Sequence, residues 1–228
     1  MKKRFVLLLL CLVLLFGLNG CSVNGNSKQS RAIKYLEERY PDDEFELVSS
    51  FGGGMGTSGH TFVFTSKKYP NAKVHVLSNG DTFKDSYLSI KYGEESRKLV
   101  DEILTRVIGE DHIVVVSTDT VLCDESPDIS FEEYKDSMYM GFSCVTSYSL
   151  DEKDREEFAE RLKNEFMNEG IKVSMSTIYF DKGTEGFADA KKYKSLRNYN
   201  GLKYADFYCV FDVTKKEEDF YIRWDEND

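Results

Sequence analysis

The sequence predicts an α+β protein with a mostly antiparallel sheet packed against three to four helices. Short strand-like runs are grouped early in the chain and alternate with helical segments later, which is the order expected of this class. The pair Asn79-Gly80 lies between two such runs and is typical of a tight hairpin turn, because both residues tolerate positive φ. The order leaves open a single domain or two α+β lobes, 30–118 and 119–228.

The first half of the chain predicts one helix, a meander of strands and a second helix. Residues 31–40 carry apolar side chains at helical spacing, and Pro41 stops this helix. A second amphipathic stripe covers 99–108 and is closed by Gly109. Four runs that alternate apolar and polar residues are expected to be strands: 44–50, 61–65, 73–77 and 82–92.

The second half predicts strands separated by helices. Ile113–Val116 is a β-branched run that suits a buried central strand. Ser149 and Glu152 have the spacing of a capping box, which predicts that a helix opens there and continues to about residue 168. Another helix is expected over 184–198. The remaining predicted strands are 139–148, 171–180, 204–213 and an edge strand over 220–224.

The first twenty residues have the three parts of a secretory signal peptide. A basic start, Lys2-Lys3-Arg4, precedes an unbroken apolar run over 5–18, and Asn19-Gly20 lead to Cys21. The run is shorter than the roughly 20 residues that a helix needs to cross the hydrocarbon core of a membrane. We therefore expect residues 1–20 to be removed and the polar residues 21–29 to form a flexible tether.

The segment Leu18-Asn19-Gly20-Cys21 resembles the lipobox of bacterial lipoproteins. The resemblance implies cleavage before Cys21, transfer of a diacylglycerol to its thiol, and a body held at the cell membrane outside the cytoplasm. Two acyl chains hold a protein stably at a membrane, whereas one chain binds only marginally. The alternative is a plain secretion signal with Cys21 as an ordinary cysteine.

A broader resemblance covers roughly residues 31–110. The stretch AIKYLEERYPDDEFELVS, followed later by KDSYLSIKYGEE, is similar to the opening of many small lipoproteins from low-GC Gram-positive bacteria, which are largely uncharacterised. This resemblance implies a compartment and a style of fold, and it brings no activity and no functional residues.

The charge of the chain limits its partners. The formal net charge is −10, and removal of Lys2, Lys3 and Arg4 would make it −13. So acidic a body does not suit nucleic acid, whose phosphates attract Lys and Arg. Anionic headgroups would also repel it, so the lipid on Cys21 has to make the membrane contact. Cationic partners, peptides and metal ions stay compatible with this charge.

The cysteines do not suggest a disulfide scaffold. Cys11 lies in the signal peptide and Cys21 in the lipobox, so Cys123, Cys144 and Cys209 remain for the body. Three thiols allow at most one intramolecular disulfide. Cys144 and Cys209 lie in predicted strands on apolar faces, which favours buried free thiols, and a Cys144–Cys209 bridge is the alternative.

No motif predicts catalysis, a cofactor or a metal. His60, His75 and His112 have no second histidine or cysteine at zinc-ligand spacing. The glycine-rich stretch 52–59 leads into a strand rather than a helix, so we expect a mobile hairpin loop and no phosphate site.

Two acidic segments also lack a binding motif. The first lacks EF-hand spacing and is expected to be a solvated loop; its residues are Asp119, Asp124, Glu125 and Asp128. In the second, which contains Asp181, Thr184 and Glu185, Thr184 is expected to cap a helix.

These observations favour a membrane-anchored extracytoplasmic lipoprotein that acts as a non-catalytic binding module. Its partner is an unidentified protein, peptide or small ligand. One alternative is an extracytoplasmic hydrolase that uses Cys123, with His60 or His112, or the acidic loop. The other is the solute-binding lipoprotein of a transporter, although the body is short for two α/β lobes and lacks their regular alternation of strands and helices.

Overall fold

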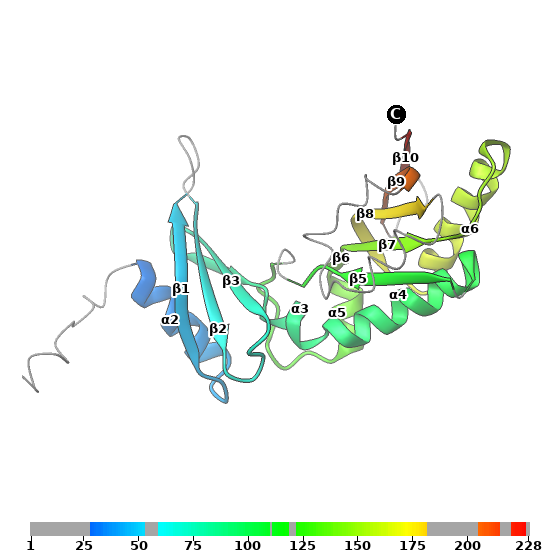
Figure 1. Ribbon diagram of the computed structural model, residues 1–228. Coiled ribbons are helices and arrows are strands. Elements are labelled where there is room, and N and C mark those ends of the chain that lie inside the picture. Colours follow the sequence, from blue (N-terminus) through cyan, green and yellow to red (C-terminus); the bar gives the residue numbers. More distant parts are fainter. Residues whose placement is uncertain are drawn as a thin grey trace, which may run out of the picture.

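Two β-sheets, each covered by helices, make up this α+β protein, as a computed structural model shows (Figure 1). The structure describes residues 28–52, 59–109, 111–118, 122–181, 205–214 and 220–226. The predicted fold class is confirmed. Residues 1–20, the tether, the lipidation site Cys21 and the helix expected over 184–198 lie outside the described residues.

The first sheet is an antiparallel meander in which neighbouring strands follow one another along the chain. Its strands, in order, are β1 (Phe45–Gly52), β2 (Gly59–Ser66), β3 (Lys73–Asn79) and β4 (Thr82–Asp85). The hairpin between β3 and β4 turns at Gly80 and Asp81, one residue later than we predicted, because Asn79 still pairs with Thr82. Gly80 supplies the positive φ of 64° that this turn requires.

The second sheet is mixed. Its strands, in order, are β10 (Tyr221–Glu226), β9 (Ala205–Val213), β8 (Lys172–Asp181), β7 (Phe142–Thr146) and β5 (His112–Val116). A short strand, β6 (Tyr139–Met140), also pairs with β8, and both β6 and β7 run parallel to it. The predicted edge strand β10 lies at one end of this order. The run Ile113–Val116 was predicted to be central, but β5 lies at the other end.

The helices divide between the sheets. The first sheet is covered by α2 (Lys28–Arg39), whose Ala32 and Leu36 are fully buried against it. Two helices lie side by side on the second sheet, α4 (Gly93–Ile108) and α6 (Arg155–Asn168). The others are short: α3 (Tyr87–Lys91), α5 (Phe131–Ser137) and the 3₁₀ turn η1 (Glu152–Asp154). No helix in the described ranges is long and apolar enough to cross a membrane.

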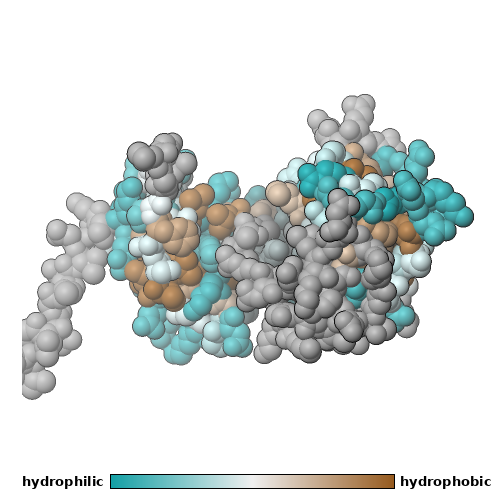
Figure 2. Space-filling model, turned by 45° about the horizontal axis from the view of Figure 1, so that its top comes forward, coloured by the Kyte–Doolittle hydropathy of each residue, from teal (hydrophilic) through white to brown (hydrophobic). Residues whose placement is uncertain are grey.

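Each sheet has its own hydrophobic core, and Figure 2 shows that some hydrophobic residues also reach the surface of the part around the first sheet. Phe62, Phe64, Val74 and Val76 pack under α2, whereas the core of the second sheet contains the apolar stripe of α4 from Val100 to Ile108. The two cores meet at α3, where Tyr87 and Ile90 pack with the first core and Leu88 packs with the second. The lobe boundary near residue 118 stays a prediction. That each lobe is a separate domain stays a prediction.

The strand predicted over 82–92 is wrong beyond its first four residues. The chain leaves the sheet after Asp85 because the Asp85 carboxylate accepts a hydrogen bond from the amide of Tyr87, at 2.9 Å, and α3 begins there. The predicted capping box at Ser149 is also wrong, since η1 precedes α6 and no side chain caps the start of either.

Candidate ligand-binding recess

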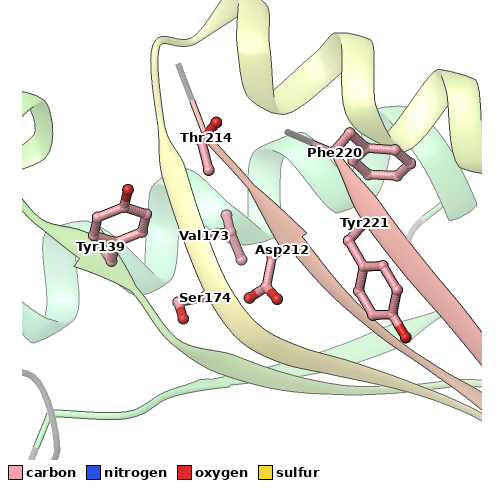
Figure 3. A pocket seen from close by; sticks show the side chains of 7 residues that line it. All are labelled: Tyr139, Val173, Ser174, Asp212, Thr214, Phe220 and Tyr221. Atoms are coloured by element: carbon pink, nitrogen blue, oxygen red, sulfur yellow. The ribbon is translucent and has the colours of Figure 1, made fainter. Parts of the chain in front are cut away.

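An open recess of about 530 Å³ lies at one end of the second sheet, where β6, β8, β9 and β10 come together (Figure 3). This volume falls within the range of about 300–1,000 Å³ that small-molecule sites commonly have. Seven of the described residues line it: Tyr139, Val173, Ser174, Asp212, Thr214, Phe220 and Tyr221. None of the seven belongs to a motif that we singled out in the sequence.

A β-bulge in β8 shapes this end of the sheet. Val173 pairs with Val213 and Ser176 pairs with Phe211, so Ser174 and Met175 together face the single residue Asp212. Bulges of this kind bend a strand and redirect side chains, and they are common beside binding sites. The hydroxyl of Ser176 accepts a hydrogen bond from the Phe142 amide at 3.0 Å, which fixes the bulge from the β7 side.

Asp212 is held in place by the bulge itself. Met175 has a φ of 48°, in the left-handed region, and its amide donates a hydrogen bond of 2.5 Å to Oδ1 of Asp212. Asp212 also pairs directly with Tyr221 across β9 and β10, which places the two side chains side by side. Within the described part of the chain, Asp212 makes no ion pair.

Exposed aromatic rings flank the carboxylate. Tyr139 is 44% exposed and Tyr221 is 53% exposed, and Figure 3 shows them on opposite sides of Asp212. The large apolar side chains that the described residues expose are Val48, Phe51, Tyr139, Met175 and Tyr221, and the last three adjoin the recess. Exposed apolar side chains gathered around a concave polar centre are typical of an interaction site.

The three cysteines within the described ranges, Cys123, Cys144 and Cys209, are buried free thiols, as we expected for Cys144 and Cys209. Cys144 and Cys209 both pair with Ile178, so β8 lies between their strands. Two strand spacings of about 4.8 Å exceed the roughly 7 Å between Cα atoms that a disulfide can bridge. The alternative Cys144–Cys209 bridge is therefore wrong.

Burial also makes Cys123 a poor nucleophile. Its side chain is buried beside Asp85, and desolvation together with that carboxylate raises the thiol pKa to about 12. Desolvation raises the pKa of Cys209 to about 12 as well, and it raises the pKa of Cys144 well above its usual range. Thiolate is the reactive form, so this arrangement does not favour a cysteine hydrolase.

Each of the three histidines lies in a strand: His60 in β2, His75 in β3 and His112 in β5. The ring of His60 lies 4.8 Å from that of Phe62, and His75 is half-buried within β3. His112 is buried, with Nδ1 at 2.7 Å from the Gly109 carbonyl and Nε2 at 3.2 Å from Asp101. The described residues contain no group of three or more His, Cys, Asp or Glu side chains that could hold a metal ion.

The acidic loop packs against the first sheet and its helix. Arg39 donates hydrogen bonds to the carbonyls of Asp124 and Glu125, and Lys84 lies 3.6 Å from the Asp124 carboxylate. Asp128 lies beside a smaller recess near Arg39. Asp119, the loop 53–58, Thr184 and Glu185 lie outside the described residues, and Asp181 ends β8.

A buried polar cluster joins this loop to α2. Asp85 is fully buried and accepts hydrogen bonds from the hydroxyls of Tyr35, at 2.7 Å, and Tyr40, at 2.9 Å, while Arg39 lies 3.3 Å away. Burial raises the pKa of Asp85, although these donors oppose the shift. Its backbone also pairs with that of Cys123 through two hydrogen bonds of 2.9 Å. Every described contact of Asp85 is internal, so we assign the cluster a structural role.

Little in the sequence identifies the recess. Asp212 alternates with the core residues Phe211 and Val213, which is ordinary for an outward-facing strand position. Its importance depends on the bulge at Ser174 and Met175, and no local residue pattern indicates that bulge. Tyr139 reaches the recess only through parallel pairing of β6 with β8.

Comparisons with known proteins give one match, and it is to a solved structure. The chain is similar to the crystal structure of a DUF5037 family protein from Ruminococcus gnavus, with a TM-score of 0.45 and 16% sequence identity. The similarity covers 85% of this chain and 94% of that chain. No protein-family model and no curated protein sequence matches the chain.

Proposed function

We propose that this protein is a lipid-anchored, extracytoplasmic, non-catalytic binding module that holds a small ligand in the recess around Asp212. The observation that carries the proposal is the recess, in which one carboxylate is fixed by a strained strand and flanked by two exposed tyrosines. A concave site with a few fixed polar groups and aromatic walls is the usual form of a small-molecule site.

The anchor rests on the sequence alone. The basic start, the short apolar run and Leu18-Asn19-Gly20-Cys21 resemble a lipoprotein signal, and a diacylated Cys21 would keep the body at the outer face of the cell membrane. An anchored module of this kind presents its binding recess to compounds outside the cell.

The non-catalytic part of the proposal is supported by the groups around the recess. Among the described residues that line it, only Asp212 is a carboxylate, and none is a histidine, cysteine or lysine. General acid–base or nucleophilic catalysis needs a reactive group together with a base or acid in hydrogen-bonding reach. The lining supplies hydroxyls, rings and one carboxylate, which suit recognition.

A fragment screen tests the binding proposal. A mixture of small fluorinated fragments is added to the full-length protein in neutral detergent micelles, and binding is followed by ¹⁹F NMR. We expect several fragments to bind weakly, and we expect Tyr221→Ala together with Tyr139→Ala to abolish binding of most of them, because the variants remove both aromatic walls.

The matched control is Phe51→Ala, which removes an aromatic side chain of equal exposure, 53%, from β1 in the first sheet. It should leave fragment binding unchanged. Fragments that bind equally well to the double tyrosine variant, or an absence of any bound fragment, would contradict the proposed site.

A further inference from the structure

We infer that the Asp212 recess binds the alkylammonium group of a small aliphatic amine, with the carboxylate as counter-charge and the tyrosine rings along the alkyl chain. This inference rests on the proposed function and names the chemical class of its ligand. It is carried by three features of the recess: its charge, the placement of its carboxylate and its rings.

The negative charge of Asp212 favours a cationic ligand in the recess. Among the described residues that line the recess, Asp212 is the one charged side chain. Two described cations close in the chain to lining residues are engaged elsewhere: Lys172 donates to the Ser137 carbonyl at 2.7 Å, and Arg223 donates to Asp225 at 2.8 Å. A phosphate or carboxylate ligand would meet repulsion here, whereas an ammonium group would neutralise the site.

The carboxylate is oriented before the ligand arrives. The Met175 amide binds Oδ1, so Oδ2 is the oxygen that can accept a hydrogen bond from a ligand. An ammonium group at Oδ2 adds the attraction between opposite charges to a charge-assisted hydrogen bond, whereas a ligand hydroxyl would make the hydrogen bond alone. Because the bulge fixes Asp212, little side-chain entropy is lost on binding.

The rings suit the rest of such a ligand. Tyrosine faces attract cations, and Tyr139 shows this within the chain, since Nζ of Lys172 lies 5.0 Å from its ring centroid. Tyr221 stands next to Asp212 across the β9–β10 pair, so a cation at the carboxylate lies beside that ring. Val173 and Phe220 extend the apolar wall on which methylene groups can pack.

Calorimetry with a matched pair of probes tests the inference. The full-length protein in neutral detergent micelles is titrated with 1,5-diaminopentane and, separately, with 1,5-pentanediol, which has the same chain length and no charge. We expect saturable binding of the diamine that weakens as salt is added, and at least about tenfold weaker binding of the diol, as a lost charged hydrogen bond predicts.

Two variants test the residues. Asp212→Asn keeps an oxygen for the Met175 amide but removes the charge, so it should weaken diamine binding by about tenfold or more. Tyr221→Ala should weaken it by about two- to fivefold and Tyr221→Phe should not. The control Asp81→Asn removes an equal charge from the hairpin of the first sheet, where Asp81 pairs with Arg31, and should change nothing.

The outcomes separate this inference from the proposed function. Equal affinity for diamine and diol, or diamine binding that Asp212→Asn leaves unchanged, would overturn the ammonium class. If the ¹⁹F fragments bind at the tyrosines while the diamine does not bind, the binding function stands and the inference falls; if nothing binds, both fall. A third probe, Nα-acetyl-lysine amide, assigns the source: tighter binding than the diamine indicates a lysine side chain instead of a free amine.

Discussion

At the scale of single residues, Met175 stands out as the one non-glycine residue with a positive φ in the described ranges. Its backbone φ of 48° lies in the left-handed region. That conformation costs a residue with a side chain roughly 1–2 kcal/mol. The hydrogen bond from its amide to Asp212 offsets part of that strain. Strain retained beside a recess is typical of a functional constraint.

Substitution of Met175 tests whether this strain is real. Met175→Val should lower the free energy of unfolding by about 1–2 kcal/mol, because a β-branched residue tolerates the left-handed region worst. Met175→Gly should leave it within about 1 kcal/mol of the wild type, since relief of strain and the added freedom of the unfolded chain oppose each other. Urea unfolding followed by circular dichroism measures both. A glycine variant as unstable as the valine variant would contradict the assigned conformation.

At the scale of helices and strands, most of the architecture could be predicted because it follows from periodicity. The helix before Pro41, the alternating strands and the glycine-terminated helices α4 and α6 appear where the pattern placed them. The errors arise where tertiary contacts decide. Residues 86–92 resemble a strand in sequence, but the carboxylate of the buried Asp85 accepts a hydrogen bond from the Tyr87 amide, where α3 begins.

The two possible capping boxes also show that residue spacing alone does not decide local structure. Ser130 with Glu133 and Ser149 with Glu152 have the same spacing, yet only the first pair forms the reciprocal hydrogen bonds, at the start of α5. The Glu133 carboxylate accepts from the Ser130 amide at 2.7 Å, which lowers the pKa of Glu133. The spacing alone did not distinguish a helix that begins at once from one preceded by a 3₁₀ turn.

Two serine substitutions distinguish these positions. Ser130→Ala should lower the free energy of unfolding by about 1 kcal/mol, because the hydroxyl that accepts from the Glu133 amide is lost. Ser149→Ala is the matched control at an exposed position that caps no helix, and it should change the stability by less than about 0.5 kcal/mol. Equal losses in urea unfolding would contradict the assignment of the cap.

At the scale of the whole molecule, the recess could not be predicted because it is assembled from strands far apart in the chain. Tyr139, Asp212 and Tyr221 meet only through the pairing of β6 with β8 and of β9 with β8 and β10. Strand order in a mixed sheet is not encoded in the alternation of any one strand. The cationic preference that we infer for this recess agrees with the acidity of the whole chain, whose net charge is −10.

The anchor is the part of the account on which the proposed location depends, and it concerns residues outside the described structure. A diacylated Cys21 would be joined to α2 by the short segment 22–27. Along the chain, the first sheet would therefore follow the anchor before the recess does.

Mass spectrometry of the protein extracted from its native membranes tests this central claim most directly. We expect a mature chain that begins at Cys21, lacks residues 1–20 and carries a diacylglycerol in thioether linkage on the Cys21 sulfur. Native protein that begins at Met1, or that begins near Cys21 with an unmodified thiol, would contradict it.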